Sequence, residues 1–149
     1  MTAEPESPSP PAVAIVSGPI DVPGLIASVA ASDAGAVALF LGTVRETTQE
    51  RRVLFLEYEG YLTMAEKRLR EIALAMPREF GPCRVAITHR IGRLEIGEIS
   101  VAIAVASPHR RVALSACAEA IERLKKTVPI WKKEHFEGGA VWIEGDPSA

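Results

Sequence analysis

The sequence predicts an α+β fold with a mainly antiparallel sheet and two longer helices. The chain has 149 residues, 48% of them hydrophobic and 24% charged, which is typical of one globular domain. Stretches with strand and helix character are interleaved without strict alternation, which favours α+β over a parallel α/β sheet. We expect the domain to cover residues 13–149 and to follow a disordered arm at 1–12, which is rich in Pro, Ser and Glu.

The first half of the domain is expected to hold three strands and two helices. In chain order they are a strand at 13–16, a helix at 22–30, a buried strand at 36–41, a strand at 53–58 and a helix at 64–76. Asp21 and Thr63 are residue types that cap helices, and Pro77 lacks the N–H needed to continue the second helix. The polar stretch 46–52 is expected to be a loop.

The second half is expected to hold three strands and the longest helix. We expect a strand at 83–90, a small hairpin or bulged excursion at 91–98, a strand at 99–106, and a last strand at 141–144 after a break at Gly138-Gly139. The helix is indicated by apolar residues at four-residue steps, Val112, Ala116, Ala120 and Leu124. Ser107 fits its N-cap and Pro108 its first turn.

Composition excludes several classes of protein. A formal net charge of −2 argues against a general polyanion binder. No apolar run has membrane-spanning length, and the N-terminus lacks the pattern of a signal peptide, so we expect a cytoplasmic protein. Cys83 and Cys117 match no metal-ligand spacing, and Cys117 reads as a buried free thiol on the helical stripe. We expect no metal site and no cofactor.

Basic residues cluster at three element boundaries, two of which suit an anion. Arg45 follows Gly42 on the turn after a buried strand, where a plain surface arginine is the alternative. His109 and Arg110 fall in the expected first turn of the long helix, with Arg111 next. Positive charge there opposes the helix dipole, whereas these side chains and the free N–H groups together suit a phosphate or carboxylate.

The third cluster is the segment Lys125–Glu134, in which four lysines flank Pro129 and Trp131. Pro129 ends the helix, so Lys125 lies in its last turn and Lys132 just beyond a rigid bend. A solvated basic turn that suits the helix dipole is the structural alternative. Clustered, partly buried ammonium groups lose protons more readily and can act as nucleophiles or transfer protons. The residues therefore indicate an enzyme or binder for a small phosphorylated substrate that works without a metal.

Five short motifs occur in a specific order along the chain. They are Phe40-Leu41-Gly42-Thr43-Val44-Arg45, Leu56-Glu57-Tyr58, His89-Arg90-Ile91-Gly92, Pro108-His109-Arg110 and Lys125-x-x-x-Pro129-x-Trp131-Lys132-x-Glu134. This ordered set resembles the large, catalytic subunit of molybdopterin synthase, from about Val13 to about Asp146. The sequence departs from the usual family pattern at Thr43, Leu114 and Ile130.

The resemblance implies an α/β-hammerhead-like fold with a small added β subdomain. It implies a sulfur transferase of molybdenum cofactor biosynthesis, which converts cyclic pyranopterin monophosphate to molybdopterin by inserting two sulfurs. The sulfur arrives as a thiocarboxylate on the C-terminal Gly-Gly of a small ubiquitin-like carrier subunit. The resemblance also implies a homodimer of this chain within a heterotetramer, and neither nucleic acid nor membrane as partner.

The motif positions carry the expected site. Lys125 and Lys132 match the two catalytic lysines. The substrate-binding set comprises Thr43, Val44, Arg45, His109, Arg110, Lys125, Lys132, Lys133 and Glu134. Two other classes stay open. One is a non-catalytic module for a phosphate ligand or RNA, although aromatics are only 5%. The other is a lysine enzyme that forms a Schiff base without a carrier.

The length of the long helix raises a geometric difficulty. His109 and Lys125 lie 16 residues apart, which is about 24 Å along a helix axis. A small pterin phosphate is too short to reach both ends. We therefore expect a two-fold dimer in which His109 and Arg110 of one chain complete the lysine site of the other. We also expect the carrier to dock near Trp142, just after the lysine segment.

Overall fold

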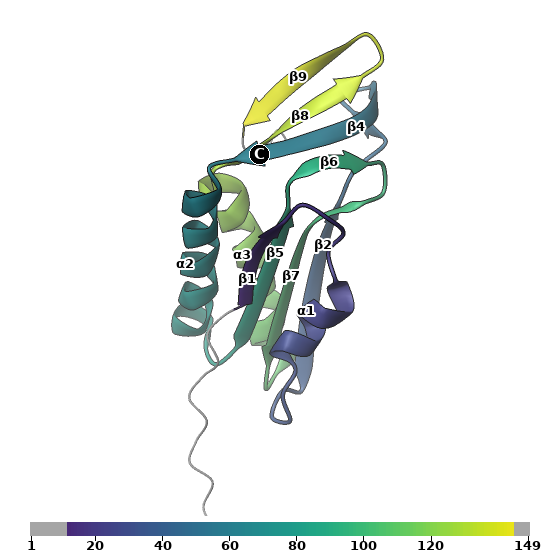
Figure 1. The fold of residues 1–149 in the computed structure, drawn as a ribbon. Coiled ribbons are helices and arrows are strands. Elements are labelled where there is room, and N and C mark those ends of the chain that lie inside the picture. The colour runs from purple at the N-terminus through teal and green to yellow at the C-terminus, as the bar shows by residue number, and fades with distance from the viewer. Residues whose placement is uncertain (1–11, 145–149) are drawn as a thin grey trace, which may run out of the picture.

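A computed structural model describes residues 12–144, which form three helices and two sheets (Figure 1). The helices are α1 (Val22–Val29), α2 (Leu62–Phe80) and α3 (Arg110–Thr127). The strands are β1 (Ala12–Val16), β2 (Ala36–Thr43), β3 (Thr47–Thr48), β4 (Arg51–Gly60), β5 (Arg84–Arg90), β6 (Gly92–Glu95), β7 (Ile99–Ser107), β8 (Ile130–Phe136) and β9 (Gly139–Glu144). The expected arm lies outside the described residues, except for Ala12, which begins β1.

The first sheet has the order β1-β5-β7-β2, and helices cover both of its faces. Only the β1–β5 pair is parallel, so the mainly antiparallel prediction is confirmed. Figure 1 shows α2 and α3 on one face and α1 on the other. Leu69 of α2, Ile103 of β7 and Ala116 of α3 are fully buried on the first face, and Leu25 of α1 packs on the second. Alanines on α3 let that helix approach the sheet closely.

The second sheet lies across one end of the first and forms the small β subdomain (Figure 1). Its order is β3-β4-β8-β9, and β6 also pairs with β4. The predicted excursion at 91–98 is thus a strand that leaves the first sheet to join the second. The chain enters this sheet again from α3 into β8, which brings the lysine segment to the junction between the sheets.

Three expected boundaries were wrong. The polar stretch 46–52 is mostly a β3–β4 hairpin, whose tip residues Gln49 and Glu50 adopt positive φ of 49° and 64°. Helix α2 begins after Tyr61, whose N–H bonds the carbonyl of Pro129, so Thr63 is not its cap. Pro77 lies inside α2, which continues to Phe80 because that ring packs against the core.

The start of α3 also differs from the expectation. Ser107 is the last residue of β7, where its hydroxyl donates to the carbonyl of His109. His109 therefore occupies the N-cap with extended backbone, and Arg110 is the first helical residue. At the other end, strand β8 at residues 130–136, which lies between β4 and β9, was not predicted, and it excludes the alternative of a solvated basic turn beyond Pro129.

Candidate active site

Lys125 and Lys132 lie on neighbouring walls of one cavity at the junction of the two sheets. The cavity has a volume of about 130 Å³. Its polar lining residues are Thr43, Arg45, Thr48, Tyr58, Ser100, Lys125, Lys132 and Glu134. The bend at Pro129 reverses the chain between α3 and β8, which is why two residues seven positions apart face the same space.

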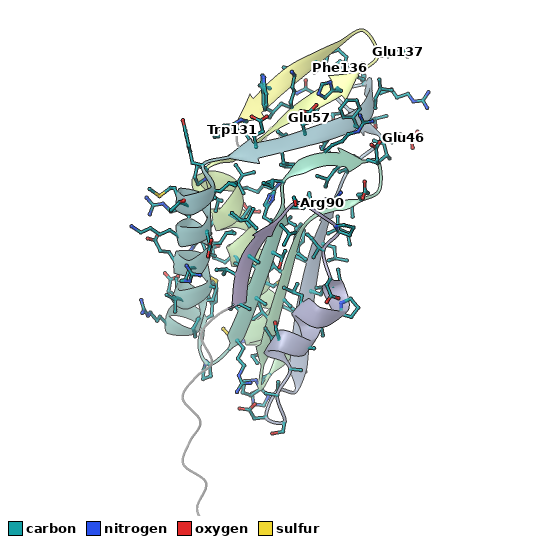
Figure 2. All side chains as sticks on the ribbon, in the orientation of Figure 1. Glu46, Glu57, Arg90, Trp131, Phe136 and Glu137 are labelled. Carbon is teal, nitrogen blue, oxygen red and sulfur yellow. The ribbon has the colours of Figure 1, made fainter. Side chains whose placement is uncertain are left out.

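A second, narrower cavity adjoins the first. It measures about 20 Å³, enough for about one water, and shares Tyr58, Lys125 and Lys132 with the wider cavity. His89 and Trp131 also line it, together with the apolar residues Leu124, Val128, Ile130 and Ile143. Figure 2 shows Trp131 at the end of the second sheet nearest the helices. The two lysines therefore line both the wide cavity and the narrow one.

The strand period decides which residues of β8 face the cavity. Lys132 and Glu134 lie two residues apart and pair with Tyr58 and Leu56 of β4, so they share the inner face. Lys133 points to the outer face, where its Nζ lies 5.3 Å from the ring centre of Trp142. Lys133 was expected to bind substrate, and its side chain does not line this cavity.

Glu134 is the acidic group of the site. Its side chain is 2% exposed, and its carboxylate lies 3.7 Å from Nζ of Lys132. Burial raises the pKa of Tyr58 above its ordinary value, a hydrogen bond with Ser100 opposes this, and the charge of Glu134 raises it further. Tyr58 therefore stays protonated near neutral pH and can donate a hydrogen bond within the cavity.

The turn after β2 supplies the opposite wall. Thr43 and Arg45 line the cavity, with the Arg45 side chain exposed at its rim. Val44 is buried in the second-sheet core, and its backbone bonds Glu98 and Gly97, so its side chain is structural. Gly42 is required for packing, because a Cβ there would lie 2.7 Å from a methyl group of buried Val101.

His109 and Arg110 lie at the far end of α3 and are exposed. Neither lines a cavity with the lysines. The 18-residue helix between the two groups confirms the expected separation within one chain. Among residues 12–144, no group of three or more His, Cys, Asp or Glu side chains is placed to hold a metal ion. Within that range no helix is long and apolar enough to cross a membrane.

Comparison with known proteins decides the family. The model of the MoaE protein family matches residues 15–127. This chain belongs to the MoaE family. It is 50% identical over 130 residues to the molybdopterin synthase catalytic subunit of Halalkalibacterium halodurans, covering 87% of this chain and 83% of that protein. The corresponding subunit of Bacillus subtilis is 48% identical over 129 residues, covering 87% and 82%.

Solved structures of MoaE proteins share the fold. The chain superposes on molybdopterin synthase from Staphylococcus aureus with a TM-score of 0.84 and 44% identity, covering 87% of this chain and 94% of that one. A MoaE protein from Burkholderia ambifaria gives a TM-score of 0.78 at 33% identity, covering 93% and 94%. The α+β fold with its added β subdomain is thus the MoaE fold.

Sequence reasoning missed four polar cavity residues of this MoaE chain, Thr48, Tyr58, His89 and Ser100. Tyr58 and His89 stand in the motifs that carry the resemblance, but their motifs gave no role for them. Ser100 is the second residue of the buried strand β7 and gave no local signal. A buried histidine and tyrosine in strands that meet at the lysines were visible only after the strands were paired.

Proposed function

We propose that this chain is the catalytic subunit of a cytoplasmic molybdopterin synthase. It converts cyclic pyranopterin monophosphate to molybdopterin with two sulfurs from the thiocarboxylated C-terminus of a small ubiquitin-like carrier subunit. The observation that carries this proposal is the meeting of Lys125 and Lys132, from different elements, in one cavity rimmed by Arg45. The names of the relatives point to the same reaction.

The charges of the cavity suit the proposed reactants. A thiocarboxylate is anionic, and the oxyanion that forms when it reacts needs cations already in place. Lys125 and Lys132 supply two ammonium groups from neighbouring walls. Arg45 at the rim suits the substrate phosphate, since its guanidinium can form two parallel hydrogen bonds. The contact with Glu134 holds the Lys132 ammonium group in one orientation.

A second copy of the chain completes the phosphate site. Strand β2 is an edge of the first sheet and exposes Val37, Leu39 and Leu41, whose exposed fractions are 45%, 40% and 37%. One end of β2 lies beside Ser107 and the other leads into Arg45. An exposed apolar stripe on the face of an edge strand suits pairing with another chain.

Antiparallel pairing of the β2 strands of two copies would bring the two separated parts of the site close to each other. Eight strand residues span about 26 Å, close to the 24 Å that separates His109 from Lys125. A two-fold axis near Leu39 then lays the far end of one β2 against the Arg45 end of the other. His109 and Arg110 of the second copy thereby reach the cavity that contains Lys125.

Reconstitution tests the reaction. The protein is mixed with a thiocarboxylated carrier and the cyclic precursor, and dithiolene product is measured. Lys125→Ala should abolish product formation, and Lys132→Ala should be nearly as damaging, without loss of the fold. Lys126→Ala is the matched control, because Lys126 is exposed in the same helical turn. Normal turnover by Lys125→Ala would remove that lysine from the mechanism.

Complementation tests the shared site. A His109→Ala/Arg110→Ala protein and a Lys125→Ala protein, each inactive alone, are mixed and allowed to exchange chains. A composite site recovers one working site per mixed dimer, up to about half of wild-type activity. Confirmed exchange with no recovered activity would place each site within one chain.

A further inference from the structure

Arg90 is a buried cation that lines neither cavity at the lysine pair. It is the last residue of β5, and its side chain is 11% exposed. Its guanidinium donates to the carboxylate of Glu98 at 2.7 Å and to the carbonyl of Arg93 at 3.4 Å. Its Nε is buried without a hydrogen-bond partner among residues 12–144. Figure 2 shows Arg90 at the end of the first sheet that faces β6.

Glu98 joins Arg90 to the turn between β6 and β7. One oxygen of its carboxylate accepts from Arg90, and the other accepts from the backbone N–H of Glu95 at 2.8 Å. These hydrogen bonds, that of Glu95 foremost, hold the pKa of Glu98 below its ordinary value, so the carboxylate is ionised at neutral pH. The turn has little apolar packing of its own, because Ile96 is exposed and Gly97 has no side chain. The bonds to the Glu98 carboxylate therefore hold its shape.

The same turn holds the backbone next to Arg45. The Val44 N–H donates to the carbonyl of Glu98 at 3.0 Å, and the Gly97 N–H donates to the carbonyl of Val44 at 2.9 Å. Val44 is buried, while its neighbours Thr43 and Arg45 line the wide cavity. Strand β2 ends at Thr43, after a shift of its register against β7. Arg45 thus lies beyond the regular ladder of the first sheet, and the two bonds of Val44 fix the chain that leads to it.

We propose that Arg90 is a positioning residue for Arg45: by holding Glu98, it fixes the turn from which Arg45 reaches the substrate phosphate. This assignment rests on the proposed function, in which Arg45 binds that phosphate. A guanidinium that forms two parallel hydrogen bonds with a phosphate needs a defined direction, and a loose backbone adds an entropic cost to binding. Loss of the Arg90–Glu98 contact should therefore weaken substrate binding through Arg45.

Hydrogen exchange tests the link between Arg90 and the turn without carrier or pterin. Exchange of single amides is followed by NMR in the wild type and in Arg90→Met, which keeps a long side chain but has no donor. The Val44 amide should exchange at least about tenfold faster relative to the amide of Ile103, which lies in the core of β7. Equal acceleration of both amides would show only a loss of global stability and would overturn the positioning role.

Arg93→Met is the matched control. It removes an Arg–Glu contact of 2.6 Å from the same segment, but the side chains of Arg93 and Glu95 are both more than half exposed. The exchange rate of Val44 relative to Ile103 should therefore stay within about twofold of wild type. An acceleration as large as that in Arg90→Met would show that the turn responds to any lost charge in this segment, which would also overturn the proposal.

Calorimetry with cyclic pyranopterin monophosphate tests the consequence for the site. Arg90→Met should raise the Kd on the order of tenfold, and in turnover it should raise KM with kcat within about threefold of wild type. In an Arg45→Ala protein the same substitution should raise the Kd less than about twofold, because the side chain that Arg90 positions is gone. Equal losses in the two backgrounds would show that Arg90 does not act through Arg45.

Glu98→Gln gives a second reading that does not depend on the Met variant folding. It keeps an oxygen for the Glu95 N–H and removes the charge that Arg90 contacts. The Kd for the pterin should rise on the order of threefold, and this rise should also disappear in the Arg45→Ala background. An unchanged Kd would overturn the proposal.

The two proposals fail in different ways. A wild-type protein that neither binds the pterin phosphate nor forms dithiolene product would refute the proposed function, while the exchange rates would still decide whether Arg90 holds the turn. Normal pterin binding and turnover by a folded Arg90→Met protein would refute the role of Arg90 and leave the proposed function standing.

Discussion

Glu134→Gln should destabilise the fold, because it leaves a mostly buried ammonium group without its counter-charge. The carboxylate of Glu134 is 2% exposed and the Lys132 side chain 16% exposed, with 3.7 Å between their charged atoms. Glutamine keeps the size of the side chain and one acceptor oxygen, so the change isolates the charge. The site therefore offers a substitution in which packing stays constant while electrostatics change.

The magnitude follows from distance and burial. At 3.7 Å and an effective dielectric constant of about 20, the attraction is about 4 kcal/mol before desolvation. Removing one partner of a fully buried ion pair costs about 3–5 kcal/mol of stability. Removing one partner of an exposed ion pair costs under about 1 kcal/mol. The intermediate exposure of Lys132 predicts a loss of about 2 kcal/mol, which lowers Tm by roughly 4–8 °C in a domain of this size.

Urea unfolding followed by tryptophan fluorescence measures the loss. A double-mutant cycle with Lys132→Met should return a coupling free energy of about 2 kcal/mol. Glu71→Gln is the control, since the Arg68–Glu71 pair is closer at 2.7 Å but both side chains are nearly half exposed, and it should change stability by under about 0.5 kcal/mol. Equal small losses of stability in both variants would show that the Lys132 ammonium group is solvated and that Glu134 does not hold it in place.

Two further predictions concern pH and the carrier. Because burial lowers the pKa of His89 to about 4, the unfolded chain binds more protons than the folded chain between about pH 4 and 6.5. The contribution of His89 to stability is therefore fully present above pH 6.5, and it should fall by up to about 3 kcal/mol as the pH drops to 4. Urea unfolding at a series of pH values measures this loss, and His89→Gln should lack it. Trp142→Glu, at an exposed position of β9, should weaken carrier binding measured by calorimetry more than substrate binding, and equal carrier affinity would remove β9 from the interface.

Elements with a strong repeat were predictable because their periodicity is local. The apolar stripe of α3 is buried from Ala116 to Leu124, and β7 is buried after its first residue, as expected. Boundaries set by contacts far along the chain were not. Pro77 is tolerated within α2 because Phe80 packs on the core. Gln49 adopts a positive φ, which its residue type does not predict.

The sequence by itself predicted which residues carry the chemistry, and it determined that Pro129 places a bend between Lys125 and Lys132. It also determined that His109 and Lys125 are too far apart to share a small ligand, since helix rise is fixed per residue. The tertiary structure alone decided that Lys132 faces inward with Glu134 while Lys133 faces Trp142. It alone brought His89 behind Lys125. Side-chain direction in a strand depends on register with a partner strand, and that register is a contact between distant parts of the chain.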